Sequence, residues 1–63
     1  MMNYTVLETL KAQNVRKAAM WFQTFLAVDK GVPSRIVKVG AALHVVADDN
    51  RAIAFSCRRR SDG

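Results

Sequence analysis

The hydrophobic pattern changes character once along the chain, at the segment Lys30-Gly31-Val32-Pro33. Before it, apolar residues recur at helical spacing, and after it β-branched residues alternate with others. Gly31 can adopt the left-handed conformation that ends a helix, and Pro33 prevents the helix from continuing. The pattern predicts a single α+β domain over residues 1–63, in which one long N-terminal helix precedes a three-stranded antiparallel β-meander.

The predicted helix begins near Val6, because Thr5-Val6-Leu7-Glu8 matches a capping box, and it ends near Lys30. When it is wound at about 100° per residue, its apolar residues form two stripes. The stripe expected to pack on the sheet contains Val15, Ala18, Ala19, Phe22, Phe25 and Leu26. A second seam runs along the whole helix and contains Leu7, Leu10, Asn14, Trp21, Phe25 and Val28.

Asn14 allows two interpretations of this helix. Either it caps a second helix after a break, or it lies in the second apolar face of one unbroken helix. A break would place Arg16 and Lys17 at the positive end of a helix dipole, where cations are disfavoured by a few tenths of a kcal/mol or more. We therefore favour the unbroken helix.

Three segments after Pro33 have strand composition and are separated by turn residues at Gly40 and at Asp48-Asp49-Asn50. They span residues 35–39, 42–46 and 52–57. If Asn50 is left-handed in a three-residue loop, Leu43 faces Phe55 and Val45 faces Ile53, which gives one apolar face. The register of the first hairpin stays open, because a Gly40-Ala41 loop would set Lys38 beside Leu43.

The helix has more apolar surface than three short strands can cover. Trp21, Leu10 and Val28 point aside from the sheet, and leaving side chains of that size exposed forfeits about 1.5–3 kcal/mol each. We therefore expect a two-fold homodimer with the helices side by side, because symmetric pairs are the commonest soluble oligomers. The second seam, Asn14 included, would form that interface, or the interface with another partner protein.

The sequence offers little chemistry for catalysis, metal binding or membrane insertion. One cysteine and one histidine cannot complete a structural zinc site, and no cofactor motif is present. The preferred register places Cys57, expected to be a core thiol, and His44 on opposite faces of the sheet. The longest uncharged stretch, residues 18–28, is too short to span a bilayer. With no secretory signal visible, we expect a cytoplasmic protein that is not an enzyme and has no small-molecule substrate.

Charge is the remaining signal, since ten Lys and Arg against five Asp and Glu give a net charge of +5. Such an excess favours DNA or RNA as a partner, through contacts with phosphates. The expected phosphate-contacting residues are Arg58, Arg59 and Arg60 in a mobile tail (residues 58–63), with Arg51, Lys38 and Arg35 as positioning charges. The alternative hypothesis is a small protein-binding inhibitor or adaptor that uses the apolar helix face.

Overall fold

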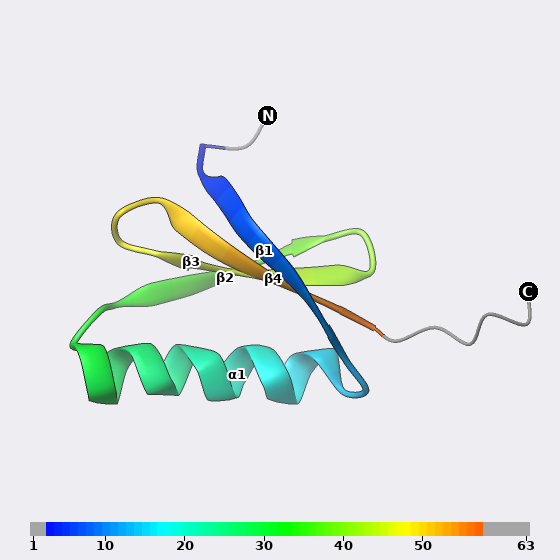
Figure 1. Cartoon of the computed structure of the whole chain (residues 1–63), viewed down its shortest axis with the longest axis horizontal. Coiled ribbons are helices and arrows are strands. Elements are labelled where there is room, and N and C mark those ends of the chain that lie inside the picture. The colour runs from blue at the N-terminus through cyan, green and yellow to red at the C-terminus, as the bar shows by residue number, and fades with distance from the viewer. Residues whose placement is uncertain (1–2, 58–63) are drawn as a thin grey trace, which may run out of the picture.

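The computed structural model describes residues 3–57, which form one sheet with a helix on one side of it (Figure 1). The elements are β1 (Thr5–Ala12), α1 (Val15–Phe25) continued by one π-helical segment η1 (Leu26–Lys30), β2 (Ser34–Val39), β3 (Ala42–Ala47) and β4 (Arg51–Cys57). The strand order is β1-β4-β3-β2, with β1 parallel to β4 and the other neighbours antiparallel. The α+β prediction is confirmed, but the sheet is mixed and has four strands rather than three.

Residues 5–12 form a strand, so the prediction of a helix beginning near Val6 is wrong. β1 pairs with β4 from Thr5 opposite Arg51 to Ala12 opposite Cys57, and the Thr5 amide donates to the Asn50 carbonyl at 2.9 Å. The ladder shifts by one residue at Leu7, which forms a β-bulge. Pairing with a strand more than forty residues away thus outweighs the local helix signal of this segment.

Asn14 is the N-cap of α1, which corrects the prediction of an unbroken helix through it. Its backbone is extended (φ −121°, ψ 97°), and its side-chain Oδ1 accepts a hydrogen bond from the Lys17 amide at 3.0 Å. A cap of this kind is worth about 0.5–2 kcal/mol, more than the few tenths that Arg16 or Lys17 costs in the first turn. The chain therefore breaks at Asn14, and the predicted single helical seam through Leu7, Leu10 and Trp21 does not exist.

The predicted end of the helix is confirmed. Gly31 is left-handed (φ 66°), and its N–H donates to the Leu26 carbonyl. The same carbonyl also accepts from the Val32 amide at 2.9 Å. These two hydrogen bonds satisfy the backbone amides of Gly31 and Val32, and the turn directs the chain into β2.

The core lies between α1 and the central strands β3 and β4. Ala19, Val45 and Phe55 are buried at its centre, surrounded by the partly buried Val15, Ala18, Phe22, Leu26, Leu43 and Ile53. This confirms the predicted sheet-facing stripe of the helix, except that Phe25 is not in the central cluster. Phe25 instead stacks on Phe22 and Trp21, with ring centroids 6.1 and 5.7 Å away.

The registers of the two hairpins follow from their turns. Leu43 pairs with Phe55 and Val45 with Ile53, as predicted, and Asn50 is left-handed (φ 65°). In the first hairpin the loop is Gly40-Ala41, with Gly40 at φ 60°, a positive angle at the first loop position as in a type II′ turn. Lys38 does stand opposite Leu43 there, and because β2 is an edge strand its side chain remains exposed.

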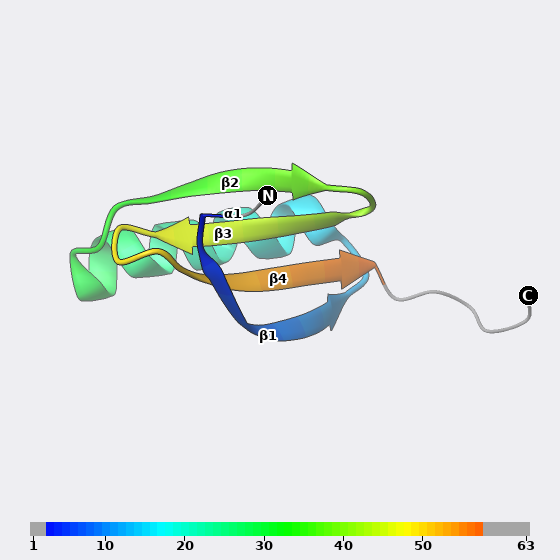
Figure 2. The ribbon, with the colours of Figure 1, turned by 90° about the horizontal axis from the view of Figure 1, so that it is seen from above.

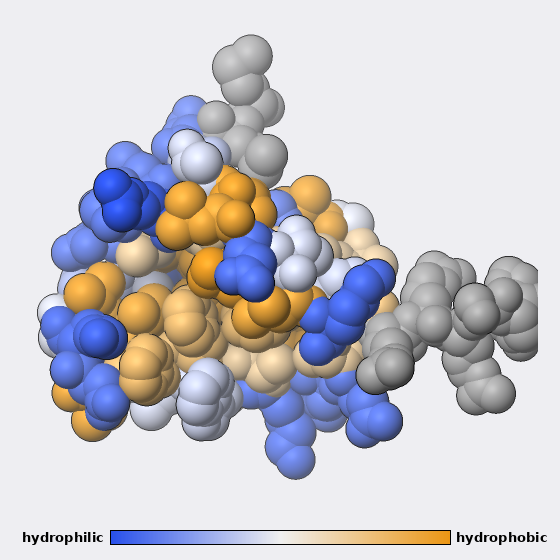
Figure 3. Space-filling view, in the orientation of Figure 1, coloured by the Kyte–Doolittle hydropathy of each residue, from blue (hydrophilic) through white to orange (hydrophobic). Residues whose placement is uncertain are grey.

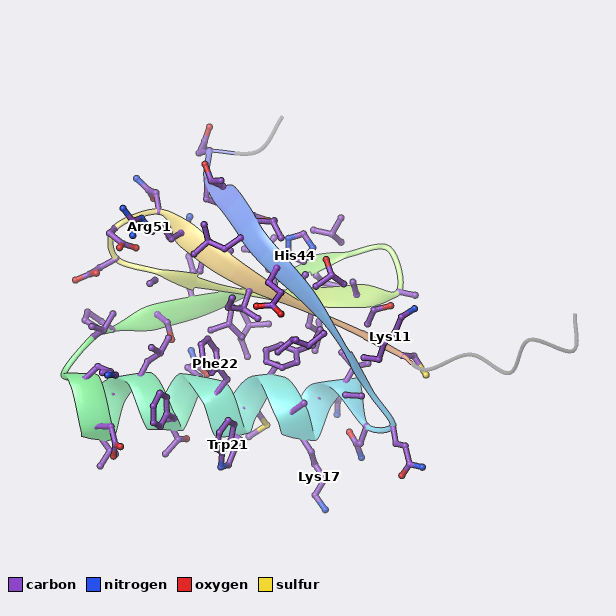
Figure 4. All side chains as sticks on the ribbon, viewed as in Figure 1. Lys11, Lys17, Trp21, Phe22, His44 and Arg51 are labelled. Atoms are coloured by element: carbon purple, nitrogen blue, oxygen red, sulfur yellow. The ribbon has the colours of Figure 1, made fainter. Side chains whose placement is uncertain are left out.

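The sheet face opposite α1 has a smaller apolar cluster of its own. Val46, Ala52 and Ala54 are buried on this face together with His44, which is 7% exposed. Tyr4, just before β1, meets the imidazole edge to face, and its hydroxyl lies 3.0 Å from His44 Nδ1 (Figure 4). The Tyr4 hydroxyl thereby gives the buried imidazole a hydrogen-bonding partner.

Cys57 is exposed at the end of β4, so its prediction as a core thiol is wrong. The register still places it on the helix side of the sheet, away from His44. Within residues 3–57, none of the helices is long and apolar enough to cross a membrane.

Candidate functional site

Charge is distributed unevenly along the long axis of the described chain. One end contains the C-terminal ends of β1, β2 and β4 and the beginning of α1 (Figures 1 and 2). We call it the cationic end, because it has four basic side chains, namely Lys11, Arg16, Lys17 and Lys38, and none of the acidic residues in 3–57. Figure 4 shows Lys11 and Lys17 there, projecting from β1 and α1.

The opposite end is of mixed charge. It contains Asp29 and Lys30 in η1, the turn carboxylates Asp48 and Asp49, and the nearby Arg51. Arg51 Nε lies 3.7 Å from Asp49 Oδ2, and the Asp49 side chain also accepts from the Arg51 amide at 3.1 Å. Arg51 is therefore engaged with its own turn, although it is largely exposed.

The three predicted positioning charges do not form one surface. Lys38 lies at the cationic end, on the helix side of β2. Arg35 stands opposite Val46, on the other face of the sheet and near the other end. Arg51 is at the mixed end, and the predicted clamp residues Arg58, Arg59 and Arg60 lie outside the described residues.

Sequence reasoning missed three members of the cationic end, Lys11, Arg16 and Lys17. Lys11 precedes the break at Asn14, and Arg16 and Lys17 follow it directly. The helix break at Asn14 would have identified them, because it places two cations at one helix terminus and a third at the end of the preceding strand. The prediction of an unbroken helix instead placed all three residues within one long helix, so they did not stand out as a group.

An apolar surface covers the side of the molecule between β1 and α1 (Figure 3). Of the predicted interface residues, Leu7 (59% exposed), Leu10 (39%), Trp21 (66%) and Val28 (74%) are exposed, and Phe25 is half-buried. The first two belong to β1 and the others to α1 and η1, so two elements contribute where one helix was predicted. Asn14, the sixth, belongs to the turn before α1.

The aromatic rings connect this surface with the core. Trp21 stacks on Phe25 at 11° between planes, Phe25 lies near Phe22, and Phe22 meets the buried Phe55 at 5.8 Å. In Figure 4 the Trp21 side chain points away from the sheet, whereas Phe22 points toward it. An exposed indole held by a ring stack keeps its orientation at little cost in conformational entropy, which suits a contact residue.

Beside these rings is a groove of about 320 Å³ on the helix side of the sheet. Val45 and Ile53 of the sheet line it together with Leu7, Phe22 and Leu26, and Asp48, Asp49 and Arg51 line it at the mixed end. The arrangement can bind apolar side chains, and its carboxylates can accept a nearby cation. Comparisons with protein families, curated proteins and solved structures found no match for this chain.

Proposed function

We propose that this protein is a small, non-enzymatic binding protein that contacts the phosphates of DNA or RNA and acts as a homodimer. The observation that supports this proposal is the segregation of charge. Four basic residues, Lys11, Arg16, Lys17 and Lys38, lie at one end, and none of the acidic residues in 3–57 lies there. The chain also continues from β4, at this end, into Arg58-Arg59-Arg60. Such a grouping favours a polyanion, because each phosphate neutralised releases condensed counterions.

The basic side chains of the cationic end project from both faces of the sheet. Lys11 and Lys38 lie on the two outermost strands, about 14 Å apart, and stand opposite Ser56 and Leu43, which places them on different faces. Lys38 is on the helix side, where the N-terminus of α1 adds the positive end of a helix dipole. Double-stranded DNA has one negative charge for each ~1.7 Å of its axis, so each face of this end can meet phosphates.

The test is a fluorescence-anisotropy titration of a mixed-sequence duplex over a series of salt concentrations. We expect Lys38→Gln and Lys11→Gln each to weaken binding and to reduce the slope of log K against log salt by about 0.9. Lys30→Gln is the matched control, because Lys30 is an exposed lysine at the mixed end. Equal losses in all three variants, or no salt-dependent binding by the wild type, would refute the proposal.

A second candidate function is the binding of another protein, as a small inhibitor or adaptor. It is favoured by the exposed Trp21, Met20 and Val28 on the helix, since tryptophan is a frequent anchor at interfaces. A pull-down from lysate with and without nuclease separates the two candidates. Partners lost on nuclease treatment support phosphate binding, and a stoichiometric protein that is retained and depends on Trp21 supports the second candidate.

A further inference from the structure

The helix covers only part of the sheet. Four strands, each about 4.8 Å wide, make a sheet about 19 Å wide, whereas a helix is about 10 Å wide. Figure 2 shows α1 behind the inner part of the sheet while β1 projects beyond it. Leu10, which stands opposite Phe55 on the helix side, is consequently 39% exposed, and Leu7 in the bulge is 59% exposed.

β1 is also an edge strand whose outer side pairs with no strand among residues 3–57. It is eight residues long and contains no proline, and beyond its bulge at Leu7 the regular stretch of residues 8–12 is open to another strand. The other edge strand, β2, follows Pro33 directly and has a basic residue on each face, Arg35 and Lys38, and such charges on an edge discourage the addition of a strand.

The distribution of charge along the molecule favours antiparallel pairing of β1 with an identical strand. Glu8 and Lys11 stand opposite Ile53 and Ser56, on different faces of β1, so they do not face each other across such a pair. Antiparallel pairing does reverse the long axis of one copy relative to the other. The cationic end of each copy then lies on the same side as the carboxylates Asp48 and Asp49 of the other, an attraction that low salt strengthens.

We propose that a second copy of this chain adds its β1 antiparallel to β1 about a two-fold axis perpendicular to the sheet. The product is a continuous eight-stranded sheet with both helices on one face. The exposed Leu7 and Leu10 of both copies meet at its centre, and the grooves beside Phe22 join into one. The inference deepens the proposed function by defining its dimer. It leaves Lys38 exposed on the far edge and Lys11 exposed on the face opposite the helices, so both remain open to phosphate contact.

The first test compares the two edges of the sheet by sedimentation velocity of the full chain without nucleic acid. The protein concentration is varied from about 1 to about 100 µM, a range that detects dimers with micromolar dissociation constants. Leu10→Lys places a charge on the proposed edge, and Ile36→Lys is its matched control. Ile36 lies on the helix side of the opposite edge strand and is 36% exposed, against 39% for Leu10. We expect dimers for the wild type and Ile36→Lys and a monomer for Leu10→Lys.

A monomeric wild type at the highest concentration would overturn the inference, and so would a dimer that Ile36→Lys disrupts and Leu10→Lys does not. A monomeric wild type would favour the second candidate function, in which the apolar surface binds another protein. Circular dichroism of Leu10→Lys shows whether that variant is folded. If it is not, the charge exchange below decides the question without altering an apolar residue.

The second test exchanges charges between the two ends. Arg16→Glu/Lys17→Glu makes the start of α1 acidic, which suits the helix dipole, so its fold is not weakened. Asp48→Lys makes the mixed end more basic. We expect each variant alone to dimerise about tenfold more weakly at low salt, and an equimolar mixture to recover dimers, because unlike ends then meet. A mixture that recovers nothing contradicts the geometry.

The dimer and the phosphate contacts can fail separately. If the wild type dimerises as described but shows no salt-dependent affinity for the duplex, the proposed function fails and the paired edge stands. If Leu10→Lys binds the duplex with the salt slope of the wild type and the wild type is monomeric, the paired edge fails and the phosphate contacts stand.

Discussion

Replacing Asn14 tests the most consequential local feature of the fold, the cap that ends β1 and begins α1. Its Oδ1 accepts from the Lys17 amide at 3.0 Å, and its carbonyl accepts from the Ala18 amide at 3.0 Å. Asn14→Ala removes the first bond and keeps the second, so we expect a loss of about 1 kcal/mol. For a domain of this size that lowers the melting temperature by roughly 4–8 °C.

The charges around the cap sharpen this prediction. Asn14→Asp keeps an acceptor and adds a negative charge at the positive end of the helix, close to Arg16 and Lys17, so we expect a gain of about 0.3–1 kcal/mol at low salt. Gln13→Ala is the control, because Gln13 is the exposed neighbouring residue. Urea unfolding, monitored by circular dichroism, measures the free energy of unfolding of these three variants and of Asn14→Leu. The reasoning would be refuted if Asn14→Ala left stability unchanged while Asn14→Leu increased it, as a buried seam would require.

Two further substitutions test the packing of the sheet by the same urea unfolding. Tyr4→Phe removes the hydroxyl 3.0 Å from His44 Nδ1 and should lower the free energy of unfolding by about 1 kcal/mol, and an unchanged midpoint would show that this bond contributes nothing. Ser34→Ala should leave stability unchanged or raise it, because Ser34 Oγ is buried without a hydrogen-bond partner among the described residues. A loss above about 1 kcal/mol would reveal a partner for that hydroxyl.

The parts of the fold that the sequence predicted are those determined by neighbouring residues. The left-handed Asn50 and the alternation around it determine the pairing of Leu43 with Phe55. The helical spacing from Val15 to Leu26 determines which residues meet the sheet, and Gly31 determines where the helix ends. These features depend on turn chemistry and periodicity, which are local.

β1 could not be predicted in the same way. Leu7, Glu8, Leu10, Lys11 and Ala12 all favour a helix by intrinsic propensity, and Thr5 with Glu8 imitates a helix start. The bulge at Leu7 and the exposure of most of the strand also remove the alternation that marks a half-buried strand. What makes it a strand is its parallel pairing with β4, and no local pattern in the sequence records that partner.

The candidate site was predicted in part for the same reason. Net charge and exposed apolar residues are properties of composition, so a basic surface and an apolar surface were both expected. Their positions depend on the break at Asn14. Because of this break, Lys11 belongs to β1 and Lys17 belongs to α1, which begins three residues after β1 ends. Trp21 and Leu10 were expected in one seam, but the structure assigns them to different elements.

The pairing of β1 with β4 is the claim on which the cationic end, the groove and the proposed dimer all depend. Nuclear Overhauser contacts between backbone protons of an isotope-labelled sample test it directly. The fold predicts cross-strand contacts between Thr9 and Ala54 and between Leu10 and Phe55. Amide contacts spaced by three residues along 6–12, with none to β4, would show that this segment is a helix and would contradict the account.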